Sequence, residues 1–292
     1  MVADLSSGFG DSVIDHQILS MKRILTAVAI LPFLIASILI SSLWWVFVLL
    51  AAAAMVVGLW EFYLLAKRLK LQPEVAAGYI AGAALITIPL QNDPANVLLV
   101  LFVIIAVTIG TLIAVTLRGA PFEKMIASVG ATLLGVLYIP LLGSHLVALR
   151  MGFPPRLSAH LLSFFFLVLM GSDAGAYYTG RSFGKRKLAP SISPGKTWEG
   201  VVGGIVAALG MAALAHFWFF RELPLKYMLP LAAIMTVLGI LGDLAESALK
   251  RGAGAKDAAN ILPGHGGILD RLDSLLFNAP LIYYFARFYF QS

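Results

Sequence analysis

Residues 97–117 read VLLVLFVIIAVTIGTLIAVTL, a run without a single charged side chain. An α-helix rises about 1.5 Å per residue, so roughly 20 apolar residues are needed to cross the hydrocarbon core of a bilayer. Hydrophobic residues make up 60% of the 292-residue chain and charged residues only 12%, and the mean hydropathy is +0.91. These values exclude a soluble globular protein and indicate a polytopic membrane protein.

Further apolar segments of similar length lie on both sides of this run. We expect transmembrane helices at about 24–41, 43–66, 75–91, 97–117, 124–148, 160–180, 199–220, 228–249 and 272–290. The expected fold class is therefore all-α, with about nine transmembrane helices. Residues 1–20 are polar and lack the apolar core of a cleavable signal peptide. We expect them to be a short tail or an artificial extension ahead of a single membrane domain at 21–292.

The placement of the basic residues predicts the topology. If the spans alternate from a cytoplasmic N-terminus, sixteen of the 21 Lys and Arg residues lie on the cytoplasmic side. Nine of those sixteen belong to the polar loops 181–198 and 250–271, which leaves seven against five elsewhere. We expect the N-terminus and both loops in the cytoplasm and the chain in the cytoplasmic (inner) membrane. The net charge of +6 reflects this placement, and we expect no nucleic-acid partner.

Charged residues gather at the ends of the last two predicted helices. Asp243, Glu246 and Lys250 are spaced to lie on one helix face, and Asp270 and Asp273 repeat the three-residue spacing. Carboxylates on neighbouring helix ends can hold a hard divalent cation such as Mg²⁺. The alternative is that the acids only pair with nearby cations to stabilise the helix ends. We favour the metal, because ionisable residues at membrane depth are commonly functional.

A glycine-rich loop lies between these two helix ends. Residues 263–267 read PGHGG, and such a loop can bring backbone N–H groups close to a ligand. It opens the last helix at its positive end, where phosphate is commonly bound. The alternative is a plain connecting loop. With the acids on both sides, we favour phosphate contact, and the cations able to neutralise phosphate oxygens are Lys250, Arg251, Lys256 and Arg271.

The second polar loop, at residues 181–200, is also a candidate for phosphate binding. Ser193, Lys196 and Thr197 lie at the entry to the seventh predicted span. A P-loop is excluded, because Pro190 stands where that motif needs glycine and we expect no preceding strand. The alternative is a cationic loop that attracts anionic lipid headgroups or acts only as a topology signal.

Two further carboxylates lie inside predicted spans. Asp173 should face the interior of the helix bundle, as a further metal ligand or as the partner of a cation. Glu61 lies beside Trp60 and close to Lys67. We interpret Glu61 as an interfacial residue and disfavour a direct role for it.

With these motifs in view, the chain resembles the bacterial phosphatidate cytidylyltransferases, also called CDP-diacylglycerol synthases. The family signature is filled here by Ser247, Lys250-Arg251, Lys256-Asp257, Ala259, Pro263, His265-Gly266-Gly267, Asp270-Arg271 and Asp273. Residues 192–200 and 242–247 are also similar to segments of that family. The resemblance covers the chain except residues 1–20.

The resemblance implies the reaction of CTP with phosphatidic acid to CDP-diacylglycerol and pyrophosphate, a step of phospholipid biosynthesis that depends on Mg²⁺. A monovalent cation such as K⁺ is a second candidate. The lipid phosphate is itself an anionic nucleophile, so it could attack the α-phosphate of CTP in line without a strong base. His265 is then better suited to a hydrogen bond with phosphate. The expected partners are CTP, phosphatidic acid and membrane lipids, and a homodimer is left open.

The resemblance also assigns roles to residues. The catalytic candidates are Asp243, Glu246, Lys250, Arg251, Asp270 and Asp273. The metal candidates are Asp243, Asp270 and Asp273, followed by Glu246 and Asp173. The substrate-binding candidates are Ser193, Lys196, Thr197, Ser247, Lys256, Asp257, Gly264, His265, Gly266, Gly267 and Arg271. By the same resemblance, we expect the 181–200 loop to cover the site formed by the 243–273 segment, with Ser193, Lys196 and Thr197 closing it. The rival functions are a CTP-dependent lipid kinase of the polyprenol or phytol type and, less favoured, an ion or proton transporter.

Overall fold

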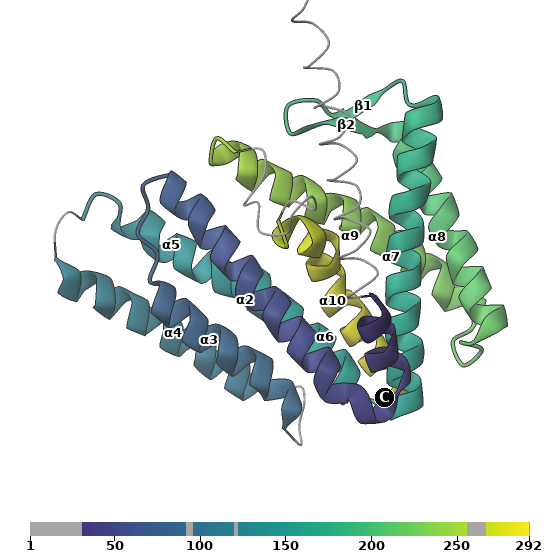
Figure 1. Cartoon of the computed structure of the whole chain (residues 1–292), viewed down its shortest axis with the longest axis horizontal. Coiled ribbons are helices and arrows are strands. Elements are labelled where there is room, and N and C mark those ends of the chain that lie inside the picture. Colours follow the sequence, from purple (N-terminus) through teal and green to yellow (C-terminus); the bar gives the residue numbers. More distant parts are fainter. Residues whose placement is uncertain (1–30, 92–95, 120–121, 256–266, 292) are drawn as a thin grey trace, which may run out of the picture.

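The computed structural model describes residues 31–91, 96–119, 122–255 and 267–291, and within these the chain is almost entirely helical. Residues 31–39 are helical and precede the other elements in this order: η1 (Ser41–Leu43), α2 (Trp44–Arg68), α3 (Val75–Thr87), η2 (Ile88–Leu90), α4 (Val97–Arg118), α5 (Met125–Val136), η3 (Leu137–Leu141), α6 (Leu142–Met151), α7 (Pro155–Phe183), β1 (Lys187–Ala189), β2 (Ser193–Thr197), α8 (Trp198–Trp218), α9 (Leu225–Gly252) and α10 (Leu269–Phe290). Figure 1 shows the helices packed side by side in a bundle.

Six helical segments of the described chain are long and apolar enough to cross a membrane. They are Ser41–Arg68, Val97–Arg118, Met125–Met151, Pro155–Phe183, Trp198–Trp218 and Leu225–Gly252. A shorter apolar helical segment runs from Val75 to Leu90. These segments support a multi-pass membrane protein. The count of nine spans stays a prediction, as does the cytoplasmic N-terminus.

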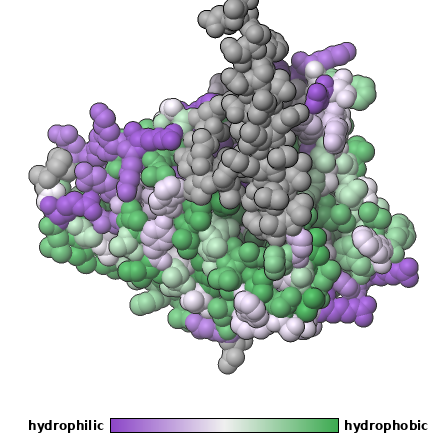
Figure 2. All heavy atoms as spheres, in the orientation of Figure 1, coloured by the Kyte–Doolittle hydropathy of each residue, from purple (hydrophilic) through white to green (hydrophobic). Residues whose placement is uncertain are grey.

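The helix ends meet in two groups at opposite ends of the bundle. At one end lies the β1–β2 hairpin (Figure 1), whose turn is bonded to the end of α9 through Arg251, and the end of α9 is paired with the start of α10 through Lys250 and Asp270. At the other end, the Gln291 side chain donates a hydrogen bond of 2.8 Å to the Gly152 carbonyl oxygen. Figure 2 shows hydrophilic residues gathered at the ends and hydrophobic residues between them. Both polar loops predicted to act together therefore leave the bundle at the same end.

Helices α7 and α8 form the closest pair of the bundle, and small residues make this possible. A Cβ added to Gly203 would lie 2.2 Å from the Thr179 hydroxyl oxygen, and one added to Gly175 would lie 2.8 Å from the Gly203 carbonyl oxygen. Small residues let the backbones of membrane helices approach closely. This packing holds α7, the helix that carries Asp173, firmly against α8.

A two-stranded antiparallel hairpin joins α7 to α8, with Lys187 opposite Thr197. The expectation that no strand precedes residues 195–197 was therefore wrong, because β1 does. Contacts beyond the strands close the hairpin, because the Glu199 carboxylate accepts the backbone N–H of Lys185 at 3.0 Å and of Arg186 at 3.2 Å. A local reading of a segment rich in proline, glycine and lysine does not reveal such long-range closure. The P-loop stays excluded by Pro190 and by the antiparallel arrangement.

Two apolar clusters hold the helices that carry the polar residues. Phe164 and Phe165 of α7 pack with Met228 of α9 and Ile282 of α10. A second cluster joins Leu59 of α2 to residues of η3 and of the first turns of α10. In a water-soluble protein, burying a side chain of this size contributes about 1.5–3 kcal/mol to folding stability. In a bilayer, helix association depends more on van der Waals packing. The start of α10 thus packs between α2 and α9.

Candidate active site

A cavity of about 500 Å³ opens at the polar end of the bundle, between α7, the hairpin, α9 and α10. The polar and charged side chains that line it are Asp173, Tyr177, Arg181, Ser193, Lys196, Thr197, Asp243, Asp270, Arg271, Asp273 and Ser274. The structure therefore brings residues of the 181–200 loop together with acids of the 243–273 segment. Only tertiary packing could do this, since the two groups are far apart in the chain.

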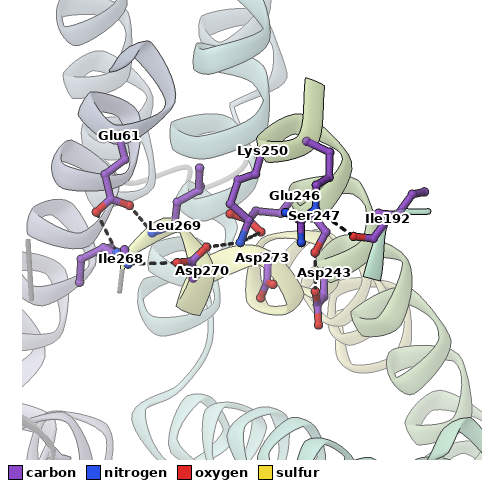
Figure 3. Close-up of polar contacts among 12 residues, drawn as sticks. Glu61, Ile192, Asp243, Glu246, Ser247, Lys250, Ile268, Leu269, Asp270 and Asp273 are labelled. Carbon is purple, nitrogen blue, oxygen red and sulfur yellow. Dashed lines mark hydrogen bonds and ion pairs between the residues drawn. The ribbon is translucent and has the colours of Figure 1, made fainter. Parts of the chain in front are cut away.

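Lys250 joins the end of α9 to the start of α10 beside this cavity (Figure 3). Its Nζ atom lies 2.7 Å from Glu246 Oε2, one helical turn earlier, and 2.5 Å from Asp270 Oδ1 on α10. The Glu246 side chain is only 1% exposed and that of Asp270 17% exposed. A charge so far from water is stable only when it is paired and hydrogen-bonded. The lysine thus fixes the two helix ends against each other.

A second lysine reaches the cavity from the hairpin. Lys196 Nζ lies 2.7 Å from Asp243 Oδ2, while the Ser247 hydroxyl donates a hydrogen bond of 3.3 Å to Asp243 Oδ1. Lys196 is the residue that the sequence placed on a covering loop. Its contact with α9 shows that the hairpin forms one wall of the cavity.

The cavity wall carries four carboxylates and three cations. The carboxylates are those of Asp173, Asp243, Asp270 and Asp273, and the cations are Arg181, Lys196 and Arg271. The Asp273 side chain is 7% exposed, and its Oδ1 accepts the Ser274 N–H at 2.6 Å. Close carboxylates repel each other in a low-dielectric site, so a cation bound beside Asp173, Asp243 and Asp273 would relieve that repulsion. Deeper in, Glu246 Oε1 is buried and has no hydrogen-bond partner within the described ranges.

A protein cage for a metal ion needs several acidic or histidine side chains around one point. Across residues 31–91, 96–119, 122–255 and 267–291, no group of three or more acidic or histidine side chains is placed to hold one ion. Mg²⁺, however, is usually bound through one or two carboxylates completed by waters and substrate phosphates. Asp243 and Asp273 fit a Mg²⁺ site that waters and substrate phosphates complete. They do not fit a site in which the protein supplies every ligand.

The cytidylyltransferase family model matches residues 21–289. The chain belongs to the cytidylyltransferase family. Curated relatives named phosphatidate cytidylyltransferase are 45% identical over 159 residues in Bacillus subtilis (53% of this chain and 57% of the relative), 45% over 134 residues in Haemophilus influenzae (44% and 46%) and 45% over 116 residues in Pseudomonas aeruginosa (39% and 43%). The chain spans about half the length of the curated relatives it matches.

In this member of the cytidylyltransferase family, three of the other predicted site residues make hydrogen bonds within the protein. Thr197 caps α8, because its hydroxyl oxygen accepts the Gly200 N–H at 3.1 Å. Arg251 Nε donates to the Ile192 carbonyl oxygen at 3.4 Å and so ties α9 to the hairpin turn. Gly267 donates its N–H to Asp270 Oδ2 at 3.0 Å. The predicted residues Lys256, Asp257, Gly264, His265 and Gly266 lie outside the described residues.

Sequence reasoning missed the part played by Glu61 of α2. Its side chain is fully buried, and its two oxygens accept the backbone N–H groups of Ile268 at 2.9 Å and Leu269 at 2.7 Å (Figure 3). The signal was present, since this is a carboxylate inside a long apolar helix. The nearby lysine at position 67 suggested an interfacial residue instead. The N–H groups at the start of α10, expected to meet phosphate, are thus held by Glu61 and Asp270.

Proposed function

We propose that this chain transfers the cytidylyl group of CTP to phosphatidic acid, giving CDP-diacylglycerol and pyrophosphate. The observation that carries the proposal is the cavity of about 500 Å³ in which Lys196 and the acids of three helices meet. It lies at the polar end of a membrane bundle, where a lipid phosphate and a soluble nucleotide can both arrive. The names of the curated relatives support the same reaction.

The proposed chemistry matches what these side chains can supply. An oxygen of the lipid phosphate attacks the α-phosphorus of CTP, the bond from that phosphorus to the bridging oxygen breaks, and pyrophosphate leaves with the electron pair. The nucleophile is already an anion, so the protein needs no strong general base. It must align the two phosphates and neutralise their charge. Lys196 and Arg271 on the cavity wall are placed for this role.

We propose Mg²⁺ as the cofactor, with Asp243 and Asp273 as its first ligands. Asp270 is a weaker candidate than its place in the signature suggests, because its two oxygens already accept from Lys250 and from Gly267. Glu246 and Asp173 remain further candidates, and K⁺ remains a candidate second ion. When bound, Mg²⁺ would neutralise charge on the phosphate oxygens. By the excess of Lys and Arg at this end, we place the cavity on the cytoplasmic side of the inner membrane.

Labelled CTP tests the proposal. The purified chain is incubated in mixed micelles with phosphatidic acid, Mg²⁺ and CTP labelled at the α- or the γ-phosphate. Label from the α-position should enter the lipid, and a chelator of divalent cations should abolish the transfer. Transfer of γ-label would instead identify a lipid kinase. Absence of any transfer, together with ion flux in liposomes that does not respond to CTP, would favour a transporter.

A further inference from the structure

Glu61 holds an unusual position for a carboxylate in a membrane helix. It lies in the middle of the second half of α2, is 0% exposed, and directs both oxygens at the first turn of a helix more than 200 residues later in the chain. Burying a charge costs several kcal/mol unless hydrogen bonds and opposite charge compensate for it. Here the backbone N–H groups and the positive end of the α10 dipole compensate. Because burying the Glu61 carboxylate is costly, we expect it to do more than fill space in the core.

The start of α10 depends on this contact. The first N–H groups of a helix have no acceptor within the helix, and Ile268, the N-cap residue, makes no side-chain capping bond. Glu61 supplies the missing acceptors for Ile268 and Leu269, and Asp270 supplies one for Gly267. Two carboxylates thus fix three successive N–H groups.

Gly267 gives independent support for the same contact. A Cβ added to Gly267 would lie 2.7 Å from Glu61 Oε2 and 3.1 Å from Glu61 Cδ. Real Cβ atoms do not approach other atoms so closely, so even alanine at this position would displace the Glu61 carboxylate or the α10 turn. Glycine at 267 is therefore matched to Glu61, whatever contact it also makes with substrate.

The fixed turn is the one that carries the acids of the cavity. Asp270 lies within this first turn and Asp273 within the next, and Asp270 is joined to Lys250. Helix α2 contributes no residue to the cavity wall. Its Glu61 carboxylate nevertheless sets the position of Asp270 and Asp273 relative to α9. A misplacement of about 1 Å at a reacting centre can cost about 100-fold in rate.

We infer that Glu61 is a positioning residue that sets Asp270 and Asp273 through the first turn of α10. It touches neither substrate nor metal. Its effect on catalysis rests on the proposed function, whereas its effect on α10 does not. Two kinds of measurement therefore test the two parts separately.

The first measurement needs no activity. Amide hydrogen exchange of the full chain in detergent is compared between the wild type and Glu61→Gln, which keeps the size of the side chain but replaces one acceptor oxygen with a donor. We expect exchange at residues 268–272 to become at least about tenfold faster, while α7 and α8 stay unchanged. Unchanged exchange at 268–272 would overturn the inference even if the wild type proved inactive.

The second measurement is kinetic. If the wild type transfers α-label, Glu61→Gln and Gly267→Ala should each lower kcat about 10- to 100-fold and raise the Mg²⁺ concentration needed for half-activation. The KM for phosphatidic acid should change less than kcat. A kcat and a Mg²⁺ midpoint like those of the wild type in Glu61→Gln would contradict the inference.

Arg150 provides the matched control. It is also a buried charge, 4% exposed, and its guanidinium donates to the carbonyl oxygens of Ser37, Ile40 and Ser41 at the end of another helix. It lies near the far end of α10, about 30 Å from Asp270 by helix length. Arg150→Lys should lower thermal stability and leave the Mg²⁺ midpoint unchanged. If it shifts that midpoint as much as Glu61→Gln does, the role of Glu61 is only structural.

Discussion

Replacing Lys250 with methionine should destabilise the fold as well as stop the reaction. Lys250 Nζ lies 2.7 Å from Glu246 Oε2 and 2.5 Å from Asp270 Oδ1, and the lysine side chain is 14% exposed. Without it, two carboxylates face each other away from water. Removing one partner of a buried ion pair costs about 3–5 kcal/mol. Because Lys250 and Asp270 keep some contact with water, we expect a loss of about 3 kcal/mol.

The same geometry predicts a partial rescue. Glu246→Gln in the Lys250→Met background removes the buried charge that Lys250→Met leaves unpaired, and neighbouring sites couple by about 0.5–3 kcal/mol. The double variant should therefore be less destabilised than the sum of the two single variants, by about 1–2 kcal/mol on that scale.

Both values can be measured by unfolding the chain in mixed micelles with increasing SDS, followed by tryptophan fluorescence. Lys67→Met, a change to an exposed lysine of α2, serves as the control and should leave the free energy of unfolding within about 0.5 kcal/mol. A loss below about 1 kcal/mol in Lys250→Met, or strictly additive losses in the double variant, would refute the view that Lys250 compensates buried charge.

Three further predictions concern the cavity wall and the packing of the neighbouring helices α7 and α8. Lys196→Met should lower transfer of α-label about 100-fold or more while the protein still elutes as a single species, and activity near that of the wild type would exclude Lys196 from phosphate binding. Gly203→Val forces a side chain into Thr179, so its melting temperature should fall by several degrees, and an unchanged value would contradict the close α7–α8 packing. Thr197→Val removes the cap of α8, which should cost about 1 kcal/mol, and thermal unfolding should show no loss if the cap is dispensable.

The sequence alone predicted a helical, multi-pass membrane protein and the aspartates that line the cavity. Long apolar runs determine helix position directly, because a bilayer leaves few other ways to satisfy the backbone. The three- and four-residue spacings placed Glu246 and Lys250 on one helix face, and the structure shows them paired. The sequence also predicted that the 181–200 loop lies over the same place, as the Lys196–Asp243 contact now shows.

What the sequence did not reveal depends on contacts between distant segments. The hairpin is closed by Glu199, which lies beyond the strands themselves. Glu61 acquires its role only when α2 packs against the start of α10. The predicted span 124–148 is one continuous helical segment, but it contains a π-helical turn at Pro140, since proline cannot donate to the helix ladder and displaces the preceding turn.

The most direct test of the account is a single-turnover measurement on Asp273→Asn. This change keeps the shape of the side chain but removes a charge from the cavity wall. With α-labelled CTP, phosphatidic acid and either low or saturating Mg²⁺, the folded variant should put almost no label into lipid, whereas Lys67→Gln should behave nearly as the wild type. Transfer by Asp273→Asn at the wild-type rate under both conditions would show that the reaction does not take place at these acids.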